Sequence, residues 1–422
     1  MDRRSPVAGP AGFGARTATG RWVHTWVSMP QLTEPDNLPP PPFRRDNLVF
    51  ADATLRQTVR LSVGARRLRL RFSNAFGGAV LPLTAVTVAL PVGGQAGVSG
   101  IRSGTSRTVT FSGRSSVCVP VGAQVVSDPL DFEIAPRSNL TVTVHLGQGQ
   151  ASNDVTSHPG SRTTSYLIAG NRVAAADLPA ATPVEHWYLL SGVEAWCDRS
   201  TAAAVLLGDS LTDGRGSSTN MNDRWPDRLY DRLRSHSATA QVAVLNQAAG
   251  GNRVLDDGLG PNALARLDRD VLSQSGVEWL VVFEGVNDIG TAEATEAAQK
   301  RVTDDLIFAY EQILTRSHAH GIRVYGATLL PFGGHTGYDD PSGLRESARR
   351  RVNDWIRTGC GFDAVLDFDE AIRDPRNPRR LLPAYDGGDH LHLNPTGYRA
   401  LADSVPVRLF RREPLPPGFG FD

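Results

Sequence analysis

The chain has 422 residues, 40% of them hydrophobic and 21% charged, which is typical of a water-soluble folded protein. At roughly 150 residues per domain, this length predicts two or three domains. Lysine plus arginine and aspartate plus glutamate number 44 each, so the formal net charge is zero. This balance argues against a nucleic-acid-binding protein and against a polybasic membrane-surface protein. No apolar run reaches the roughly 18 residues that a membrane-spanning helix needs.

Residues 1–45 are predicted to form an extended N-terminal arm. They contain Pro39-Pro40-Pro41-Pro42, and proline cannot donate a hydrogen bond inside a sheet. Residues 1–21 are polar and lack the apolar core of a secretory signal.

Residues 46–200 carry short runs in which apolar and polar residues alternate. Leu68–Phe72 and Leu140–Leu146 show the period of two that places alternate side chains on opposite faces of a strand. Gly, Pro, Ser and Asn separate these runs. The pattern predicts a β-rich domain of the antiparallel sandwich or jelly-roll type.

Residues 201–412 change to a repeated order of strand, loop and helix. The strands are short, apolar and not alternating, as expected when helices cover both faces of a sheet. The expected strands are Ala203–Leu207, Val242–Leu245, Trp279–Phe283, Val324–Leu329 and Ala364–Leu366. Helices are expected from Pro226, from Pro261 to near Gly276, over Glu293–His320, and around Leu344–Ile356. The order predicts an open parallel α/β sheet, which binds ligands at the carboxyl ends of its strands. Residues 413–422 are predicted to be a C-terminal tail.

The first candidate catalytic residue is Ser210, in Gly208-Asp209-Ser210-Leu211-Thr212-Asp213 directly after the first of these strands. A serine at a strand-to-loop turn lies at the edge of the sheet where ligands bind. Its hydroxyl becomes a nucleophile when a base removes its proton. A simple Gly-Asp-Ser turn is the alternative.

The second candidate is the pair Asp389 and His392, in Asp389-His390-Leu391-His392. An aspartate three residues before a histidine can hold one imidazole nitrogen and stabilise the imidazolium that forms when the ring takes a serine proton. His392 has this spacing and His390 does not. The same segment also fits a loop before a helix capped by Asn394, and both interpretations can hold together.

Two further strand ends carry candidate oxyanion donors. Asn287, in Glu284-Gly285-Val286-Asn287-Asp288, can donate its amide, and Gly250-Gly251 lets the backbone approach a ligand closely. Each motif alone is equally compatible with an ordinary turn. His335 lies in the loop 331–341 and is either a cleft residue or a surface histidine.

In chain order the motifs are Ser210, Gly250-Gly251, Asn287 and the pair Asp389 and His392. Residues 208–392 therefore resemble the SGNH (GDSL) hydrolase family, whose four sequence blocks match these four motifs. The resemblance implies a flavodoxin-like sheet, with Ser210 as nucleophile, His392 as base and Asp389 as its partner. It implies an oxyanion hole made by the N–H groups of Ser210 and Gly251 and the side chain of Asn287, with Gly250 as a competing donor. Asp209 and Asp288 are interpreted as residues that organise loops.

The first half resembles the β-rich extension found in some microbial secreted GDSL-type esterases, including ones similar to polysaccharide deacetylases. This resemblance implies an extracellular protein. It is carried by the alternating pattern, by Trp22–Trp26 and by Phe72–Gly77. Tryptophans could stack on sugar rings, although core positions are the commoner use. The candidates are Trp22, Trp26, Trp187 and Trp196.

The leading functional hypothesis is a cofactor-free serine esterase that removes short acyl groups, acetyl above all, from plant polysaccharide. The alternatives are a lipid or aryl-ester acylhydrolase of the same mechanism, and a glycan-binding protein with an inactive hydrolase half. The sequence has no metal-binding His-Glu-x-x-His motif and no phosphate-binding glycine loop, so neither a metal nor a nucleotide cofactor is expected. It leaves the oligomeric state open, and also the pairing of Cys118, Cys197 and Cys360.

Overall fold

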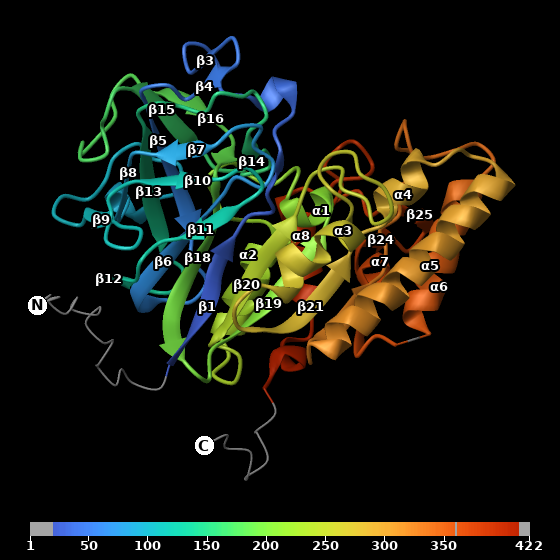
Figure 1. Cartoon of the computed structure of the whole chain (residues 1–422). Helices are drawn as coiled ribbons and strands as arrows, with labels where there is room; N and C mark the ends of the chain where they lie inside the picture. Colours follow the sequence, from blue (N-terminus) through green and yellow to red (C-terminus); the bar gives the residue numbers. More distant parts are fainter. Residues whose placement is uncertain (1–19, 359–360, 413–422) are drawn as a thin grey trace, which may run out of the picture.

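The computed structural model describes residues 20–358 and 361–412. Figure 1 shows a part made mainly of strands beside a part made of strands and helices. Residues 1–19 of the predicted arm, Cys360 and the predicted tail 413–422 lie outside the described residues. Among the described helices, none is long and apolar enough to cross a membrane.

The first half of the chain forms antiparallel sheets, as the alternating runs predicted. One has the order β1-β18-β6-β11 with β12 also paired to β6, and another has the order β16-β15-β5-β13-β8-β9. In β6, Leu68, Leu70 and Phe72 are buried while the intervening arginines are more exposed. The bounds are β1 Gly20–Val27, β5 Ala53–Arg60, β6 Ala65–Ser73, β8 Ala85–Ala89, β9 Arg107–Val109, β11 Gln124–Val126, β12 Leu130–Ile134, β13 Asn139–Leu146, β15 Ser165–Ala169, β16 Thr182–Val184 and β18 Leu190–Asp198.

Smaller elements complete this half. A three-stranded sheet of order β17-β14-β2 is the one that matters for the site. Its strands are β2 Gln31–Leu32, β14 Thr156–His158 and β17 Trp187–Tyr188. The remaining elements are the pairs β3 Arg44–Arg45 with β4 Leu48–Val49 and β7 Leu81–Leu83 with β10 Val117–Val119, and the 3-10 turns η1 Pro35–Asn37 and η2 Val92–Gly94.

The prediction of an extended arm up to residue 45 is wrong for its described part. Residues Gly20–Val27 form β1, which pairs antiparallel with β18, and Val23–Val27 are buried. The strand that pairs with β1, β18, lies about 170 residues further along the chain, so a local sequence pattern cannot reveal the pairing. The proline run follows this strand and lies outside every sheet, in agreement with its missing N–H groups.

The second half contains the predicted parallel sheet with helices on both faces. Its order is β20-β19-β21-β22-β23, and all neighbouring strands run parallel. Numbered from β19, this is the 2-1-3-4-5 order of flavodoxin-like sheets. The strands are β19 Ala202–Gly208, β20 Val242–Ala248, β21 Val277–Phe283, β22 Arg323–Ala327 and β23 Ala364–Leu366.

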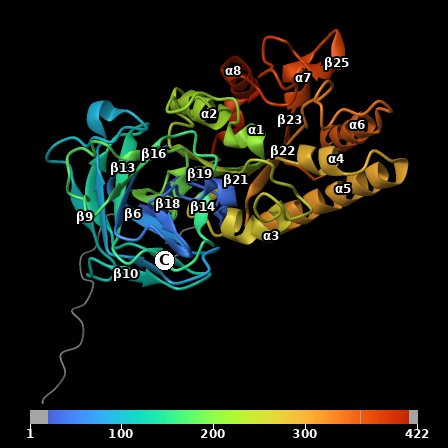
Figure 2. The ribbon, with the colours of Figure 1, turned by 90° about the horizontal axis from the view of Figure 1, so that it is seen from above.

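The helices lie on both faces of this sheet, with α2, α7 and α8 on one side and α3 and α5 on the other (Figure 2). Their bounds are α1 Ser210–Asp213, α2 Trp225–Arg234, α3 Ala263–Leu267, α4 Val286–Thr291, α5 Glu296–Ala319, α6 Leu344–Arg357, α7 Phe368–Ile372 and α8 Pro395–Ser404. The helix expected from Pro261 to Gly276 is two segments, α3 and the π-helical turn η3 Asp268–Leu272. The short pair β24 Arg373–Asp374 with β25 Asn377–Leu381 and the turn η4 Val407–Phe410 complete the chain.

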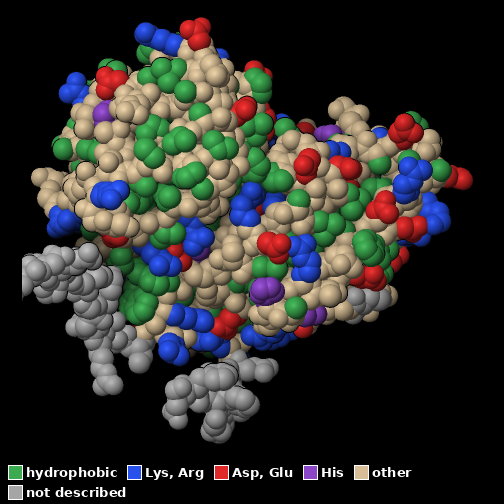
Figure 3. All heavy atoms as spheres, in the orientation of Figure 1, with side chains coloured by type: hydrophobic (Ala, Val, Ile, Leu, Met, Phe, Trp, Pro, Cys, Tyr) green, Lys and Arg blue, Asp and Glu red, His purple; other side chains and the backbone are tan. Residues whose placement is uncertain are grey.

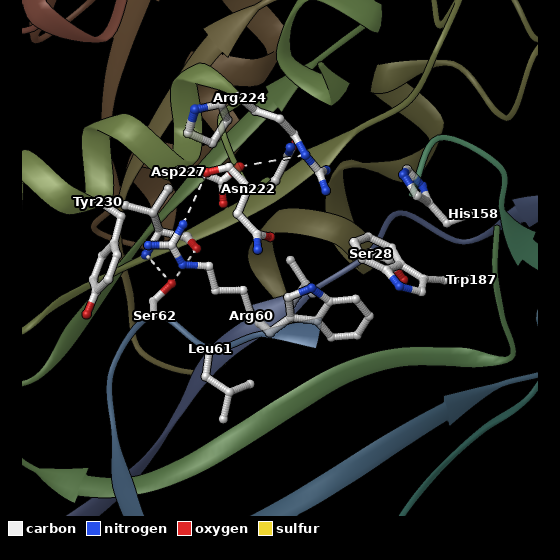
Figure 4. A pocket seen from close by; sticks show the side chains of 15 residues that line it. Ser28, Arg60, Leu61, Ser62, His158, Trp187, Asn222, Arg224, Asp227 and Tyr230 are labelled. Atoms are coloured by element: carbon white, nitrogen blue, oxygen red, sulfur yellow. Dashed lines mark hydrogen bonds and ion pairs between the residues drawn. The ribbon is translucent and has the colours of Figure 1, made fainter. Parts of the chain in front are cut away.

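Hydrogen bonds join the two halves of the chain along a buried interface. His24 donates its backbone N–H to the carbonyl of Ser275 at 3.1 Å, and the hydroxyl of Ser62 donates to the carbonyl of Val244 at 2.9 Å. A cavity of about 50 Å³ lies at this interface, and Figure 4 shows the side chains from both halves that line it. On the face shown in Figure 3, acidic and basic side chains are interspersed over both halves, in keeping with the balanced composition.

An ion pair between His158 and Asp213 lies in this interface. The Nε2 atom of His158 is 2.9 Å from Oδ1 of Asp213, and its Nδ1 atom is 3.1 Å from the carbonyl oxygen of Met29. Both neighbours are acceptors, so the ring of His158 lies between two groups to which its nitrogens can donate. Burial alone would raise the pKa of Asp213, but the charge and hydrogen bond of His158 outweigh it and lower the pKa.

Replacing His158 by alanine is expected to destabilise the fold by about 3–5 kcal/mol, because it leaves the buried Asp213 carboxylate without its partner. The side chains are 4% and 1% exposed, so water does not compensate for the loss. Urea unfolding measures the change. The matched control is His318→Ala, whose pair with Asp363 is 42% and 35% exposed and is worth at most about 1 kcal/mol. Equal losses in the two variants would contradict the stabilising role of this buried contact.

Candidate active site

Ser210 lies where the buried strand β19 turns into α1. The side chain of Asp209 caps this helix by accepting from the backbone N–H of Leu211 at 2.9 Å. Gly208 allows the turn, because a Cβ there would lie 2.6 Å from the hydroxyl of Thr212 and 2.9 Å from the carbonyl oxygen of Phe283. The hydroxyl of Ser210 is thereby fixed at the carboxyl edge of the sheet.

Ser210, His392 and Asp389 form one hydrogen-bonded chain, although Ser210 is separated from the other two by about 180 residues. The hydroxyl of Ser210 is 2.8 Å from Nε2 of His392, and Nδ1 of His392 is 2.6 Å from Oδ2 of Asp389. The other carboxylate oxygen of Asp389 accepts from the backbone N–H groups of His392 at 2.8 Å and Leu391 at 3.0 Å. In the neutral ring, Nδ1 therefore donates to Asp389 and Nε2 faces the serine as an acceptor.

His390 takes no part in this chain. Its Nδ1 atom is 2.6 Å from Oδ2 of Asp386, and its side chain is 46% exposed, against 9% for His392. The spacing argument that separated the two histidines in the sequence agrees with this geometry.

The environment sets the charges of the two groups. Burial would raise the pKa of Asp389, but hydrogen bonds from the backbone and ring of His392 outweigh it and bring the pKa to about 2. Burial lowers the pKa of His392 below its ordinary value of 6.5, and Asp389 opposes that shift. At neutral pH the pair is therefore a carboxylate and a neutral imidazole that can accept a proton.

The candidate oxyanion donors face the same place. The amide of Asn287 is fixed, since its Nδ2 donates to the carbonyl of Asn252 at 2.8 Å and its Oδ1 accepts from the hydroxyl of Tyr338 at 2.7 Å. One Nδ2 hydrogen remains for a ligand. Gly250, Gly251 and Asn287 line one cavity with Ser210 and His392. Gly251 has a φ of 71°, which favours glycine, and both glycines stay candidates for the backbone donor.

Residues 206–400 match the model of the GDSL-like lipase/acylhydrolase family. This part of the chain is a GDSL-like acylhydrolase domain. The family match makes the protein a hydrolase of the carboxylic-ester type. The match falls on the parallel sheet and its helices and includes Ser210, Asn287, Asp389 and His392. The comparison with curated proteins gave no match.

Solved structures similar to the acylhydrolase domain cover about half of the chain. A G-D-S-L family protein from Desulfitobacterium hafniense DCB-2 is 20% identical, with a TM-score of 0.36, over 48% of this chain and 97% of that one. The acetyl xylan esterase AlAXEase is 20% identical, with a TM-score of 0.35, over 48% and 96%. A catalytic mutant of Axe2, an acetylxylan esterase from Geobacillus stearothermophilus, is 18% identical, with a TM-score of 0.37, over 48% and 91%.

Arg266 of the acylhydrolase domain joins the ends of three strands, and sequence reasoning missed it. Its guanidinium donates to the carbonyl of Gln247 at 2.6 Å, to the carbonyl of Gly208 at 3.3 Å and to Oε2 of Glu284 at 3.3 Å. Its Nε donates to Oδ1 of Asn252 at 2.9 Å. The residue is 1% exposed, whereas an arginine on a helix is usually interpreted as solvated.

Glu284 interacts with two further buried carboxyl groups, those of Asp209 and Asp288. Burial raises the pKa of Asp209 to about 7, that of Glu284 to about 8 and that of Asp288 to about 6. The carboxylate of Asp288 accepts from the backbone N–H groups of Val254 at 2.9 Å and Leu255 at 2.9 Å. Asp288 thus ties the loop that follows Gly250-Gly251 to the segment that carries Asn287.

Ser210, His392 and Asp389 open into a cavity of about 590 Å³ that both halves of the chain line. From the acylhydrolase domain come Leu259, His335 and Tyr338, among others. His335 is therefore a cleft residue. From the first half come Gln31, Glu34, Asn37, Arg162, Glu185 and His186, none of which the sequence singled out.

The four candidate tryptophans do not line this cavity. Trp26 and Trp187 are 7% and 4% exposed and make an edge-to-face pair with ring centroids 5.0 Å apart. Trp22 and Trp196 form a second such pair at 5.3 Å. These tryptophans pack against other side chains of the protein, which is a commoner use of tryptophan than stacking on sugar rings. Cys118 and Cys197 are free thiols in the described part of the chain.

Proposed function

We propose that the protein is a serine esterase in which Ser210 is the nucleophile, His392 the general base and Asp389 its orienting partner. The observation that carries the proposal is the continuous chain of 2.8 Å and 2.6 Å from the Ser210 hydroxyl through His392 to Asp389. A serine hydroxyl becomes nucleophilic when a positioned base removes its proton, and a carboxylate stabilises the resulting imidazolium.

The proposed reaction has two halves. Nε2 of His392 takes the proton of Ser210 as Oγ attacks the ester carbonyl, and the negative oxygen is held by the N–H groups of Ser210 and Gly251, or Gly250, and by Nδ2 of Asn287. His392 then gives the proton to the departing alcohol, leaving an acyl-serine. Water, activated by the same ring, releases the acid. Asp209 and Asp288 organise the loops, a role that their backbone contacts support.

The acyl group is proposed to be short, with acetyl as the first candidate. Next to the oxyanion donors the cavity is bounded by Leu259 and by Tyr338, whose hydroxyl contacts Asn287. A Cβ on Gly251 would lie 2.4 Å from Cδ1 of Leu259, so this wall approaches closely. The alcohol is proposed to belong to a plant polysaccharide such as xylan, and the site of action to be outside the cell.

A chain-length series of nitrophenyl esters tests this proposal. We expect the acetate ester to give the highest kcat/KM and acetylated xylan to release acetate. Activity confined to long-chain esters would favour the lipid acylhydrolase alternative. No ester hydrolysis, together with retention of Ser210→Ala on insoluble polysaccharide, would favour the glycan-binding alternative.

The pH profile of kcat/KM is expected to lose activity on the acid side with an apparent pKa below 6.5, the ordinary value for histidine. Protonated His392 cannot accept the serine proton, and burial, which lowers the pKa of His392, moves this loss to more acidic pH. In Asp389→Asn the group that raises the pKa is gone, so the acid limb moves further down in pH. A limb that moves to higher pH in this variant would contradict the assignment of the pair.

Asn287→Ala is expected to lower kcat by about 10²–10³ with little change in KM, because the amide is needed only when the oxyanion forms. Tyr338→Phe removes the hydroxyl that fixes the Asn287 amide and is expected to cost less than Asn287→Ala. Steady-state kinetics on nitrophenyl acetate measure both. A main effect on KM in Asn287→Ala would mean that the amide binds the ground state instead.

A further inference from the structure

One wall of the catalytic cavity comes from the first half of the chain and is built of polar side chains. Gln31 lies on β2, Glu34 and Asn37 lie at the turn η1, and Arg162 follows β14. Glu185 and His186 lie between β16 and β17. We call these six residues, Gln31, Glu34, Asn37, Arg162, Glu185 and His186, the polar wall.

Glu34 is held in one orientation. Nε2 of Gln31 donates to its Oε1 at 2.6 Å, and Nδ2 of Asn37 donates to its Oε2 at 2.9 Å. The segment itself is anchored, since the carbonyl of Asn37 accepts from the hydroxyl of Tyr188 at 2.6 Å. Each carboxylate oxygen can accept more than one hydrogen bond. The carboxylate therefore keeps acceptor capacity for a donor in the cavity.

His186 adds a second acceptor to the polar wall, and Arg162 adds donors. Nδ1 of His186 is 2.8 Å from the carbonyl oxygen of Pro159, so this nitrogen donates and Nε2 is left for another partner. Burial lowers the pKa of His186, so its ring is neutral and Nε2 accepts. Nη2 of Arg162 reaches Asp213 only at 4.0 Å, and the side chain is 30% exposed on the cavity wall. Its guanidinium thus has donors to spare.

We infer that the polar wall is the binding site for the alcohol part of the ester, and that this alcohol is a neutral, polyhydroxylated carbohydrate. Hydroxyl groups both donate and accept, and the wall offers fixed acceptors on Glu34 and His186 beside spare donors on Arg162. Carboxylates and arginines both line the cavity, so the polar wall does not present the single sign of charge that would select an ionic alcohol. This inference rests on the proposed esterase function and names the residues that bind its alcohol.

A long apolar alcohol fits this wall poorly. It would cover the polar side chains without replacing their hydrogen bonds to water, and unpaired polar groups oppose binding. A site built to hydrogen-bond hydroxyl groups rejects substrates that lack them. The β-rich half thus completes the active site in addition to packing against it.

The test compares two acetate esters, nitrophenyl acetate and a monoacetylated methyl xyloside, in the full-length chain. We expect Glu34→Ala to lower the ratio of kcat/KM for the xyloside to kcat/KM for nitrophenyl acetate about tenfold or more. The matched control is Asp36→Ala, an exposed carboxylate two residues away that does not line the cavity. It is expected to leave the ratio unchanged.

The outcomes separate the two levels of the proposal. Hydrolysis of neither ester by the wild type would overturn the esterase function itself. Hydrolysis of nitrophenyl acetate alone, or an unchanged ratio in Glu34→Ala, would overturn the carbohydrate site and leave the esterase standing. Binding gives an independent measurement. Titration calorimetry with xylotetraose should detect weaker binding to Ser210→Ala/Glu34→Ala than to Ser210→Ala, and equal affinity would contradict the inference.

Discussion

Ser210→Ala is expected to reduce the hydrolysis of nitrophenyl acetate to the buffer background, a loss in kcat on the order of 10⁶. The alanine has no oxygen to attack the ester carbonyl, and the other members of the chain act only through that oxygen. Ser210 is 5% exposed, and its hydroxyl lies 2.8 Å from Nε2 of His392. Removing this one oxygen is expected to leave the surrounding structure little changed. Initial rates of the purified variant measure the effect.

Ser218→Ala is the matched control, because this serine follows α1 and does not line the catalytic cavity. It should retain wild-type activity. If the wild type, Ser210→Ala and Ser218→Ala unfold at the same urea concentration, the loss of activity in Ser210→Ala comes from the missing nucleophile and not from a less stable fold. Full activity in Ser210→Ala would refute the role of Ser210 as nucleophile.

His392→Ala is expected to lower kcat by about 10⁴, because the general base and the proton donor for the alcohol disappear together. His390→Ala is the matched control two residues away. Its ring contacts Asp386 and is 46% exposed, so its removal should have a much smaller effect. Rates with nitrophenyl acetate decide between them. The reverse order of effects would show that the wrong histidine has been assigned to Ser210.

The parallel sheet and the residues at its edge could be predicted because their signals are local. A buried strand such as β19 is a short apolar run, and the residue that follows it lies at the carboxyl edge of the sheet by geometry alone. Asp389 and His392 are three residues apart, so their contact depends on little else. Asn394 caps α8 with Pro395 behind it, as the sequence pattern indicated.

Features that depend on distant partners could not be predicted. The assignment of β1 as a strand depends on pairing with β18 far along the chain. Arg266 is buried only because the ends of β19 and β20 and the side chain of Glu284 meet around it. Glu34 and His186 line the catalytic cavity only because the two halves pack together. Nothing in their neighbouring sequence marks them.

Covalent labelling can show whether the reaction passes through an acyl-serine at Ser210. The wild-type protein is treated with a fluorophosphonate, which bonds to activated serine hydroxyls, and the labelled peptide is identified by mass spectrometry. We expect one label, on Ser210, with loss of activity in proportion to labelling and no label in Ser210→Ala. Complete labelling of a different residue, or full activity after Ser210 is labelled, would contradict the acyl-serine mechanism.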